Sequence, residues 1–544
     1  MTVPRSWGAA LAAAISFAAP AALAQGKPAA PAAPAKPPAP ACTITYDKPD
    51  EIKDAHSSLG KAEVYFQQHL AEQEKKPLSQ AVEKLTLRND RYAANMNAHD
   101  QLLAQALVMW SVIPGVGENP KRGTLGFLGD KEQPIDLLKT ADSLFSIVEK
   151  NVPACAEDIS TYRQMAWGPI INQVGPLLNA GKLDSAAALV TKANGIYRDS
   201  PFNYYFEGQI AYRQDRDQQA SIAYEKATQL GNKELAANPN DANIVNITEW
   251  SAFFAAYAGQ RAAAKLPADS QPAAYKRVIG LYQSYLKTYG CPQFAENAQS
   301  SLFDVMRIVN DTAGERAELK KMSEAAKPCT DIQWYTAARD ARDLGDAQLA
   351  ITLADKAVAF SPWSAGLGNA AAVYFDLKAW DKLLPAATRL TQIAPNLPDN
   401  YQLVAQSYLG FAEKEKSAAK KKALTDSATT FYDAGEKLDV NIRISEFTSD
   451  GNKRVVGGSL KLVDHTPGAQ SKPAKGKGGK PAAAAPAATA PKPRTVTVKV
   501  SFLDRSGAVV TTDSATVNAS TENTKFKITV TGDKIIGYKY APVQ

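Results

Sequence analysis

The chain has 544 residues, four cysteines and a formal net charge of +7. Six cations and no acid lie between Ser471 and Arg494, and together with Arg5 they equal the whole formal charge. The rest of the chain is therefore neutral, so net charge gives no argument for a nucleic-acid-binding surface. A chain of this length is also too long to fold around a single hydrophobic core.

Residues 1–24 have the pattern of a secretory signal peptide. One positive charge at Arg5 precedes a short apolar stretch, and Ala22, Leu23 and Ala24 form a cleavage site with small residues at its two key positions. The apolar stretch is shorter than the roughly 20 residues that a membrane-spanning helix needs. We therefore expect cleavage near Ala24 and a periplasmic or secreted protein that does not span a membrane.

Residues 25–41 form a linker rich in proline and alanine, a composition that keeps a chain semi-rigid and extended. Residues 42–160 follow as an N-terminal helical region, because residues 48–113 have a helical pattern and are nearly free of proline and glycine.

The four cysteines predict two disulfides, because an exported protein folds in an oxidising compartment. Cys291 and Cys329 bracket two helical stretches, and a helical hairpin brings its two ends together. Cys42 and Cys155 bracket the N-terminal helical region and pair by elimination. A metal site is disfavoured because there is no CxxC motif and the four histidines are not spaced like ligands. We expect no metal and no cofactor.

From Trp167 onwards a period of 34 residues appears. In the clearest unit, counted from Pro201, small residues stand at positions 8 and 20 (Gly208 and Ala220) and an aromatic residue at position 24 (Tyr224). Small residues at these positions let two helices approach closely, and the aromatic ring fills the space beside their contact. A later unit has the same spacing, with Trp334, Ala338, Ala350, Ala357 and Pro362.

This pattern resembles the tetratricopeptide repeat family, whose repeat is a helical hairpin of 34 residues. The resemblance covers residues 165–437 with gaps. It implies a mainly α protein with an α-solenoid of hairpins, which we place at residues 161–438. Residues 231–329 depart from the period, so we expect hairpins of a different size there.

The resemblance also implies which side chains line the concave groove of the solenoid. Tyrosines flanked by arginines suit an extended peptide that carries a carboxylate or acidic side chains. An ordinary solvated face is the alternative interpretation. The positions that match the groove of the family are Tyr205, Gln209, Tyr212, Arg213, Tyr335, Arg339 and Arg342.

At Asp439 the pattern changes from helical to alternating, which is typical of β-strands. The stretch Ser471 to Arg494 has no hydrophobic residue larger than alanine, and it separates two strands from the rest. Two strands alone are marginal in water. We therefore predict one small β-sandwich at residues 439–544, with a disordered loop inserted at residues 466–494.

The run SFLDRSGAVV within this region resembles the secreted β-sandwich domains of the FxLYD type. Phe502, Leu503, Asp504 and Gly507 carry the resemblance, and Leu503 stands where that family has a tyrosine. The resemblance implies a fold and says almost nothing about activity.

No catalytic motif tied to a recognisable scaffold is present in the sequence. We therefore predict an exported, non-enzymatic scaffold that binds a protein or peptide partner in the cell envelope and does not bind nucleic acid. A weak contact between the cations of residues 471–494 and anionic envelope polymers is a secondary expectation.

Two alternatives remain open: a carbohydrate- or cell-wall-binding accessory protein, and an enzyme with an unrecognised site. Paired exposed aromatic side chains would favour sugar or peptide binding. A buried cluster of perturbed carboxylates would favour an enzyme.

Overall fold

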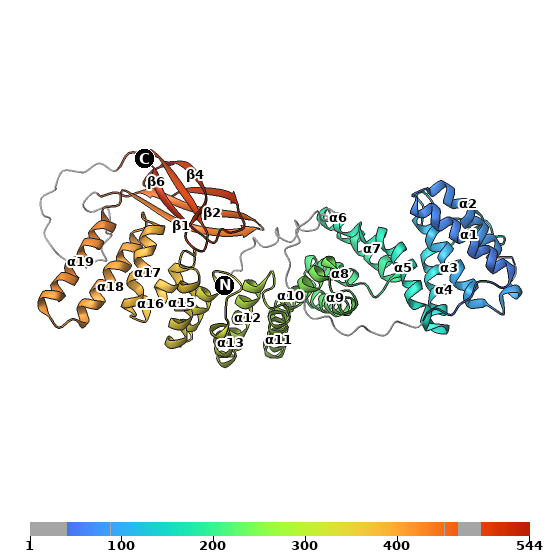
Figure 1. Ribbon diagram of the computed structural model, residues 1–544, viewed down its shortest axis with the longest axis horizontal. Coiled ribbons are helices and arrows are strands. Elements are labelled where there is room, and N and C mark those ends of the chain that lie inside the picture. Colours follow the sequence, from blue (N-terminus) through green and yellow to red (C-terminus); the bar gives the residue numbers. More distant parts are fainter. Residues whose placement is uncertain (1–40, 88, 451, 466–490, 544) are drawn as a thin grey trace. The chain divides into compact units, whose positions relative to one another are not determined.

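The computed structural model describes residues 41–87, 89–450, 452–465 and 491–543 (Figure 1). The expected signal peptide, the linker up to residue 40 and most of the expected inserted loop lie outside the described residues. The chain divides into two compact units, one ending at Tyr289 and the other beginning at Gly290. The expected division near residue 160 stays a prediction.

Within the described residues, the first unit is built from helices. Consecutive helices form hairpins, and each hairpin packs on the next (Figure 1). The α-helices are α1 (Asp50–Gln67), α2 (Ala71–Leu85), α3 (Met96–Val112), α4 (Leu137–Asn151), α5 (Ala156–Ile171), α6 (Val174–Asn179), α7 (Leu183–Ile196), α8 (Pro201–Arg213), α9 (Asp217–Ala237), α10 (Ala242–Ala264) and α11 (Gln271–Tyr289).

Helices α1 to α5 share one hydrophobic core, to which Leu59, Leu107 and Phe145 contribute. Helix α3 lies at its centre, because its apolar residues occur on every side and it is buried along most of its length. The disulfide between Cys42 and Cys155 joins the start of this bundle to the start of α5, with 4.4 Å between the two Cα atoms. This predicted pairing is confirmed.

The hairpin of α8 and α9 has the packing that its sequence pattern predicts. A Cβ atom placed on Gly208 would lie 2.7 Å from the ring of Tyr224, so only glycine permits this approach of the two helices. Tyr224 is buried, and its ring also contacts Tyr205 and Phe254. The aromatic ring therefore joins its own hairpin to α10 of the next one.

The departure from the 34-residue period has a simple structural cause. Helix α9 has 21 residues, α10 has 23 and α11 has 19, whereas α8 has 13. Longer helices keep the hairpin arrangement and lengthen the repeat.

The second unit continues with helical hairpins and ends in strands. Its helices are α12 (Ala295–Ile308), α13 (Thr312–Glu324), α14 (Gln333–Asp343), α15 (Ala347–Phe360), α16 (Leu367–Asp376), α17 (Trp380–Ile393), α18 (Pro398–Lys414) and α19 (Ala418–Glu436). Its strands are β1 (Val440–Asp450), β2 (Lys453–Leu462), β3 (Arg494–Leu503), β4 (Val509–Ala519), β5 (Thr524–Thr531) and β6 (Gly537–Val543). The disulfide between Cys291 and Cys329 closes the hairpin of α12 and α13, as predicted.

The six strands form two three-stranded antiparallel sheets, in the orders β1-β2-β5 and β4-β3-β6. Alternate residues of β3 point into the core, among them Val496, Val498 and Val500. Strand β2, which precedes residues 466–490, pairs with β5, which follows them. The strands on both sides of this segment therefore belong to one sandwich, and the predicted fold class of hairpins followed by a β-sandwich is confirmed.

The sandwich packs against the loops that connect successive hairpins. The turn between β3 and β4 places Arg505 on Asp331, with Nε 2.7 Å from Oδ1 and Nη2 3.2 Å from Oδ2. The same guanidinium lies 4.2 Å from the ring centroid of Phe360. Gly507 has φ +87°, and a Cβ atom there would lie 2.6 Å from Cδ1 of Trp363. This turn therefore contacts two inter-hairpin loops.

A third inter-hairpin loop contacts β1. The Ile442 N–H donates to the Asn396 carbonyl at 2.9 Å, and the Asn396 side chain donates to the Val440 carbonyl at 3.2 Å. The Tyr540 hydroxyl on β6 donates to the Ile442 carbonyl at 2.7 Å and ties the two sheets together. The sandwich thus holds the loops after α13, α15 and α17.

Candidate binding pocket

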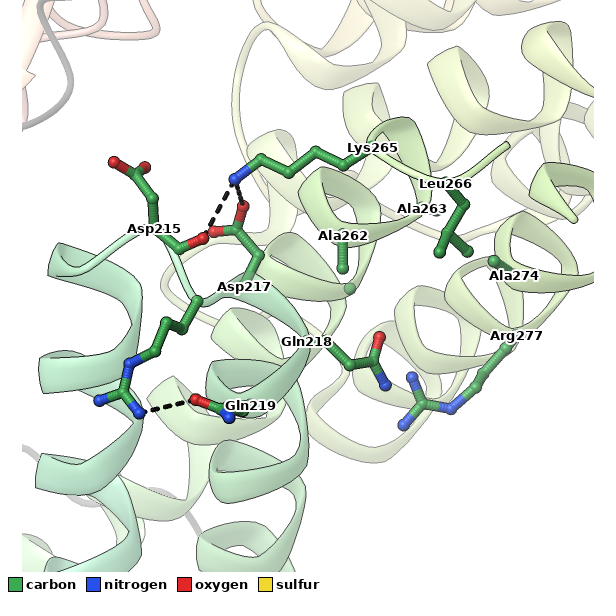
Figure 2. A pocket seen from close by; sticks show the side chains of 12 residues that line it. Asp215, Asp217, Gln218, Gln219, Ala262, Ala263, Lys265, Leu266, Ala274 and Arg277 are labelled. Carbon is green, nitrogen blue, oxygen red and sulfur yellow. Dashed lines mark hydrogen bonds and ion pairs between the residues drawn. The ribbon is translucent and has the colours of Figure 1, made fainter. Parts of the chain in front are cut away.

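A pocket with a volume of about 690 Å³ opens in the first unit (Figure 2). This size lies in the range of ligand sites in proteins. One side is formed by the turn between α8 and α9 and by the first turn of α9. The C-terminal part of α10 and the beginning of α11 complete the pocket.

The floor of the pocket consists of small residues of α10, namely Gly259, Ala262 and Ala263. A Cβ atom on Gly259 would lie 3.2 Å from Oγ of Ser221 on α9 and 3.3 Å from Cγ2 of Val278 on α11. Glycine at this position therefore lets α10 lie close to both neighbouring helices. Because no long side chain rises from the floor, the space above it stays open.

The two acids of the pocket are already paired within the protein. The Asp217 carboxylate is 1% exposed, and it lies 2.6 Å from Nζ of Lys265 and 3.1 Å from Nε of Arg261. Asp215 lies 2.8 Å from Nη2 of Arg261. Burying an unpaired carboxylate would be costly, so these two cations compensate the charge of Asp217. Figure 2 shows Lys265 reaching across the turn toward both acids.

The groove residue Tyr212, inferred from the sequence, supports this network from behind. Its hydroxyl accepts a hydrogen bond from Nη1 of Arg261 at 2.9 Å, and the Arg261 guanidinium lies 4.6 Å from its ring centroid. Tyr257 packs beside Tyr212, and burial raises the pKa of Tyr257. The Tyr212 ring therefore fixes the arginine that pairs with both acids.

The remaining polar groups of the pocket come from Arg216, Gln218 and Gln219 on one side and Arg277 on the other. In Figure 2 the side chains of Gln218 and Arg277 extend over the floor from facing helices. Arg216 donates to the Gln219 side chain at 2.7 Å, and within the described residues no carboxylate lies within ion-pair distance of it. Arg277 pairs with Glu225 and stays 43% exposed. This rim can donate hydrogen bonds to an incoming acid.

Three of the groove residues inferred from the sequence lie in the interior. Tyr205 and Tyr335 are 2% and 0% exposed, and Gln209 is buried as well. The Tyr335 hydroxyl donates to the Ser361 carbonyl at 2.8 Å. These side chains pack between helices, and the function proposed below does not depend on them.

The three groove arginines differ in what they contact. Arg213 donates to the carbonyl of Leu178, which ends the preceding hairpin. Arg342 pairs with Asp376 at 2.9 Å and with its neighbour Asp343 at 2.7 Å. Arg339 keeps 46% of its side chain exposed, with Asp340 3.8 Å away. Of the three, Arg339 is the one most open to a partner.

The pocket itself brings together residues that the repeat pattern did not single out. Arg216 follows directly on the turn that the sequence did locate. Lys265 and Arg277 lie in the stretch where the 34-residue period is lost, so no repeat position could be assigned to them. The sequence signal that could have found them is their spacing along two long helices next to Gly259.

A buried group of acids in the second unit has a different character. Glu315 and Asp340 are buried, and both pair with Arg307, which lies 3.0 Å from Oδ1 of Asp340. Burial raises the pKa of both carboxyls. The neighbouring cavity, lined by Glu296 and Asp340, measures about 10 Å³, which is room for one water molecule. The group joins α12, α13 and α14 and leaves no space for a substrate.

Two further searches cover only the described part of the chain. No helix in it is both long and apolar enough to cross a bilayer. No group of three or more histidine, cysteine, aspartate or glutamate side chains in it could hold a metal ion.

The chain matches no family model and no curated protein. Among solved structures it is similar to the TPR2AB domain of yeast Sti1 in complex with pHSP90, with 14% identity and a TM-score of 0.21 over 50% of this chain and 98% of that chain. It is also similar to the human IFIT1 dimer with m7Gppp-AAAA, with 11% identity and a TM-score of 0.25 over 73% and 96% of the two chains. The TPR domain of P58(IPK) has 10% identity and a TM-score of 0.20 over 71% and 91%. Because these values are low, the fold is established by the hairpins themselves.

Proposed function

We propose that this chain is an exported scaffold that binds an acidic segment of a protein partner and performs no chemistry on it. The pocket between α9, α10 and α11 is the binding site. The observation that carries the proposal is the division of charge there: the acids are paired inside the fold, whereas Arg216 and Arg277 face the opening. An entering carboxylate gains charge-assisted hydrogen bonds from these arginines.

The floor of the pocket supports a peptide over a bulkier ligand. Gly259, Ala262 and Ala263 form a surface without long side chains, over which a backbone or small side chains can lie. The preformed walls reduce the entropy lost on binding, because the Arg261 network already holds the turn between α8 and α9 in place. The favoured ligand is therefore an aspartate or glutamate flanked by small residues.

Export is supported by the sequence of residues 1–24 and by the two disulfides, which are typical of oxidising compartments. N-terminal sequencing of the protein recovered from a periplasmic fraction is expected to begin at Gln25. A chain recovered from the cytosol with its first residues intact would contradict export.

The sugar-binding and enzymatic alternatives lack a comparable observation within the described residues. Phe375 and Tyr432 are exposed, but Phe375 already packs edge-on against Trp380. The buried acids around Arg307 enclose no substrate-sized cavity.

A site-specific photo-crosslinker tests the binding site in the full mature chain. Placed at Gln218 in the rim, it is expected to capture a discrete partner from envelope extract, whereas at Gln229, an exposed residue further along α9, it is expected to capture none. Equal capture at both positions would assign the contact to a surface other than the pocket.

Synthetic peptides test the ligand class. An acetylated Ala-Glu-Asp-Ala peptide is expected to bind, and the Ala-Gln-Asn-Ala peptide is not. Arg277→Glu is expected to weaken binding at least about 10-fold, since a charge-assisted hydrogen bond contributes about 1.5–3 kcal/mol. Lys276→Glu makes the same charge change on the neighbouring exposed residue and is the matched control. If the two variants bind equally, long-range charge alone attracts the peptide and the pocket is not its site.

A further inference from the structure

The outer edge of β4 has no role in the function proposed above. Strand β4 has 11 residues and ends the sheet β4-β3-β6, so that it pairs with β3 alone (Figure 1). Most of its residues are exposed, and Val509 and Val510 expose 50% and 42% of their surface. An edge strand presents unpaired backbone N–H and C=O groups, which can template another strand.

The other edge strands of the described sandwich are covered or guarded. Strand β1 contacts the loop after α17 through Ile442 and Asn396, and β6 packs against α17. Strand β5 carries Lys525 and Lys527. Strand β4 has no lysine, arginine or proline, the residues with which proteins usually block an edge. It is therefore the unguarded edge of the described sandwich.

The sequence of β4 suits pairing with itself. When two antiparallel copies overlap over all 11 residues, the middle residue Ser514 lies on the two-fold axis. In this register Asp513 faces Ala515 of the second copy, so the two acids do not oppose each other. Thr512 faces Thr516 of the second copy, and such threonine pairs stabilise antiparallel strands. Strand β4 already makes one with β3, where Oγ1 of Thr516 lies 2.9 Å from Oγ1 of Thr497.

We propose that two copies of this chain associate through β4, antiparallel about a two-fold axis at Ser514. The contact joins two three-stranded sheets into one sheet of six strands. Because each copy contributes its one unguarded edge, the assembly closes at two copies and does not grow into a fibre. A single strand pair buries less than the roughly 1,200 Å² of a stable interface, so the dimer is weak, with a dissociation constant in the micromolar range or above.

Sedimentation velocity of the mature chain across the micromolar range tests the association. The wild type is expected to shift from monomer to dimer as concentration rises. Thr512→Lys puts a charge on the edge and is expected to keep the chain monomeric, while Thr529→Lys, on the exposed side of β5, is the matched control and is expected to leave the dimer intact. A wild type that stays monomeric, or a dimer that Thr512→Lys leaves unchanged, would overturn the proposal.

Introduced cysteines test the register independently of how well the lysine variants fold. Both native disulfides consume all four cysteines, so a single new thiol is specific. Ser514→Cys is expected to form a covalent dimer on mild oxidation, because directly opposed residues lie within disulfide reach. Thr511→Cys, which faces Val517 of the second copy, is expected to form none. Equal cross-linking at both positions would contradict this register.

The side chain of Asp513 supplies a variant of opposite sign. Its Oδ1 accepts the N–H of Ser514 at 2.7 Å and so covers a donor on the strand. Asp513→Ala removes this cover and the charge, and it is expected to strengthen the dimer several-fold. A weaker dimer, or a β4 edge that captures an unrelated extended peptide in place of a second copy, would overturn the assignment.

Discussion

The two compact units hold their hairpins together by different means. In the first unit, hairpins join through glycine and tyrosine packing, as Gly208 and Tyr224 show, and the first helices form a bundle around α3. In the second unit a β-sandwich contacts three successive inter-hairpin loops through Arg505, Gly507 and Ile442. The difference shows that an array of hairpins can be stabilised from within, by its core, or from outside, by a second domain bound along its loops.

Removing each disulfide is expected to break this comparison most strongly. Cys42 and Cys155 are 113 residues apart, and Cys291 and Cys329 are 38 apart. Loop-closure entropy predicts losses of about 5 and about 4 kcal/mol respectively when each pair becomes serine. Hydrogen exchange in denaturant, which reports each unit separately, is expected to show each loss confined to its own unit. A loss shared by both units would show that they unfold together.

Gly507 tests whether the sandwich holds the loops. Gly507→Ala introduces a Cβ atom against Trp363 at a positive φ, which is expected to cost about 1–3 kcal/mol and to raise hydrogen exchange in the loop after α15. Gly345→Ala is the control, because Gly345 has φ +74° but a Cβ atom there meets nothing within 4 Å. If the two variants lose equal stability, backbone strain explains the effect and contact with Trp363 does not.

A buried acid gives the first unit a pH dependence of its own. Burial raises the pKa of Glu74 to about 7 from the ordinary 4.5. The folded chain then keeps a proton that the unfolded chain loses near pH 4.5, so the free energy of unfolding falls as pH rises from about 4.5 to about 7. Glu74→Gln is expected to remove this part of the slope in urea titrations. An unchanged slope would mean that another group is responsible.

The smallest expected effect concerns the ion pair between Arg505 and Asp331. Arg505 is half-exposed, so Arg505→Ala is expected to cost about 1 kcal/mol through the lost pair and the lost contact with Phe360. Asp331→Asn and the double variant complete a thermodynamic cycle. A coupling energy near zero would show that the pair is incidental to docking of the sandwich.

The parts of the fold that the sequence predicted are those with a strict local pattern. Gly208 and Tyr224 mark a hairpin because only small and aromatic residues satisfy that helix contact, and the alternation around Val498 marks a strand. The pocket could not be predicted in the same way. Gly259 and Arg277 meet only after two long helices pack, and their separation follows no repeat. Burial of Tyr205 was equally hidden, since it depends on Tyr224 and on the packing between hairpins.

The loop after α13 has a mechanical consequence. Cys329 in this loop is covalently joined to the beginning of its own hairpin, and two residues further on Asp331 binds Arg505 of the sandwich. Tension applied to the sandwich therefore reaches a closed covalent ring before it reaches the helices beyond. Because the ends of that hairpin cannot separate, the chain between Cys291 and Cys329 cannot lengthen under load while the disulfide is intact.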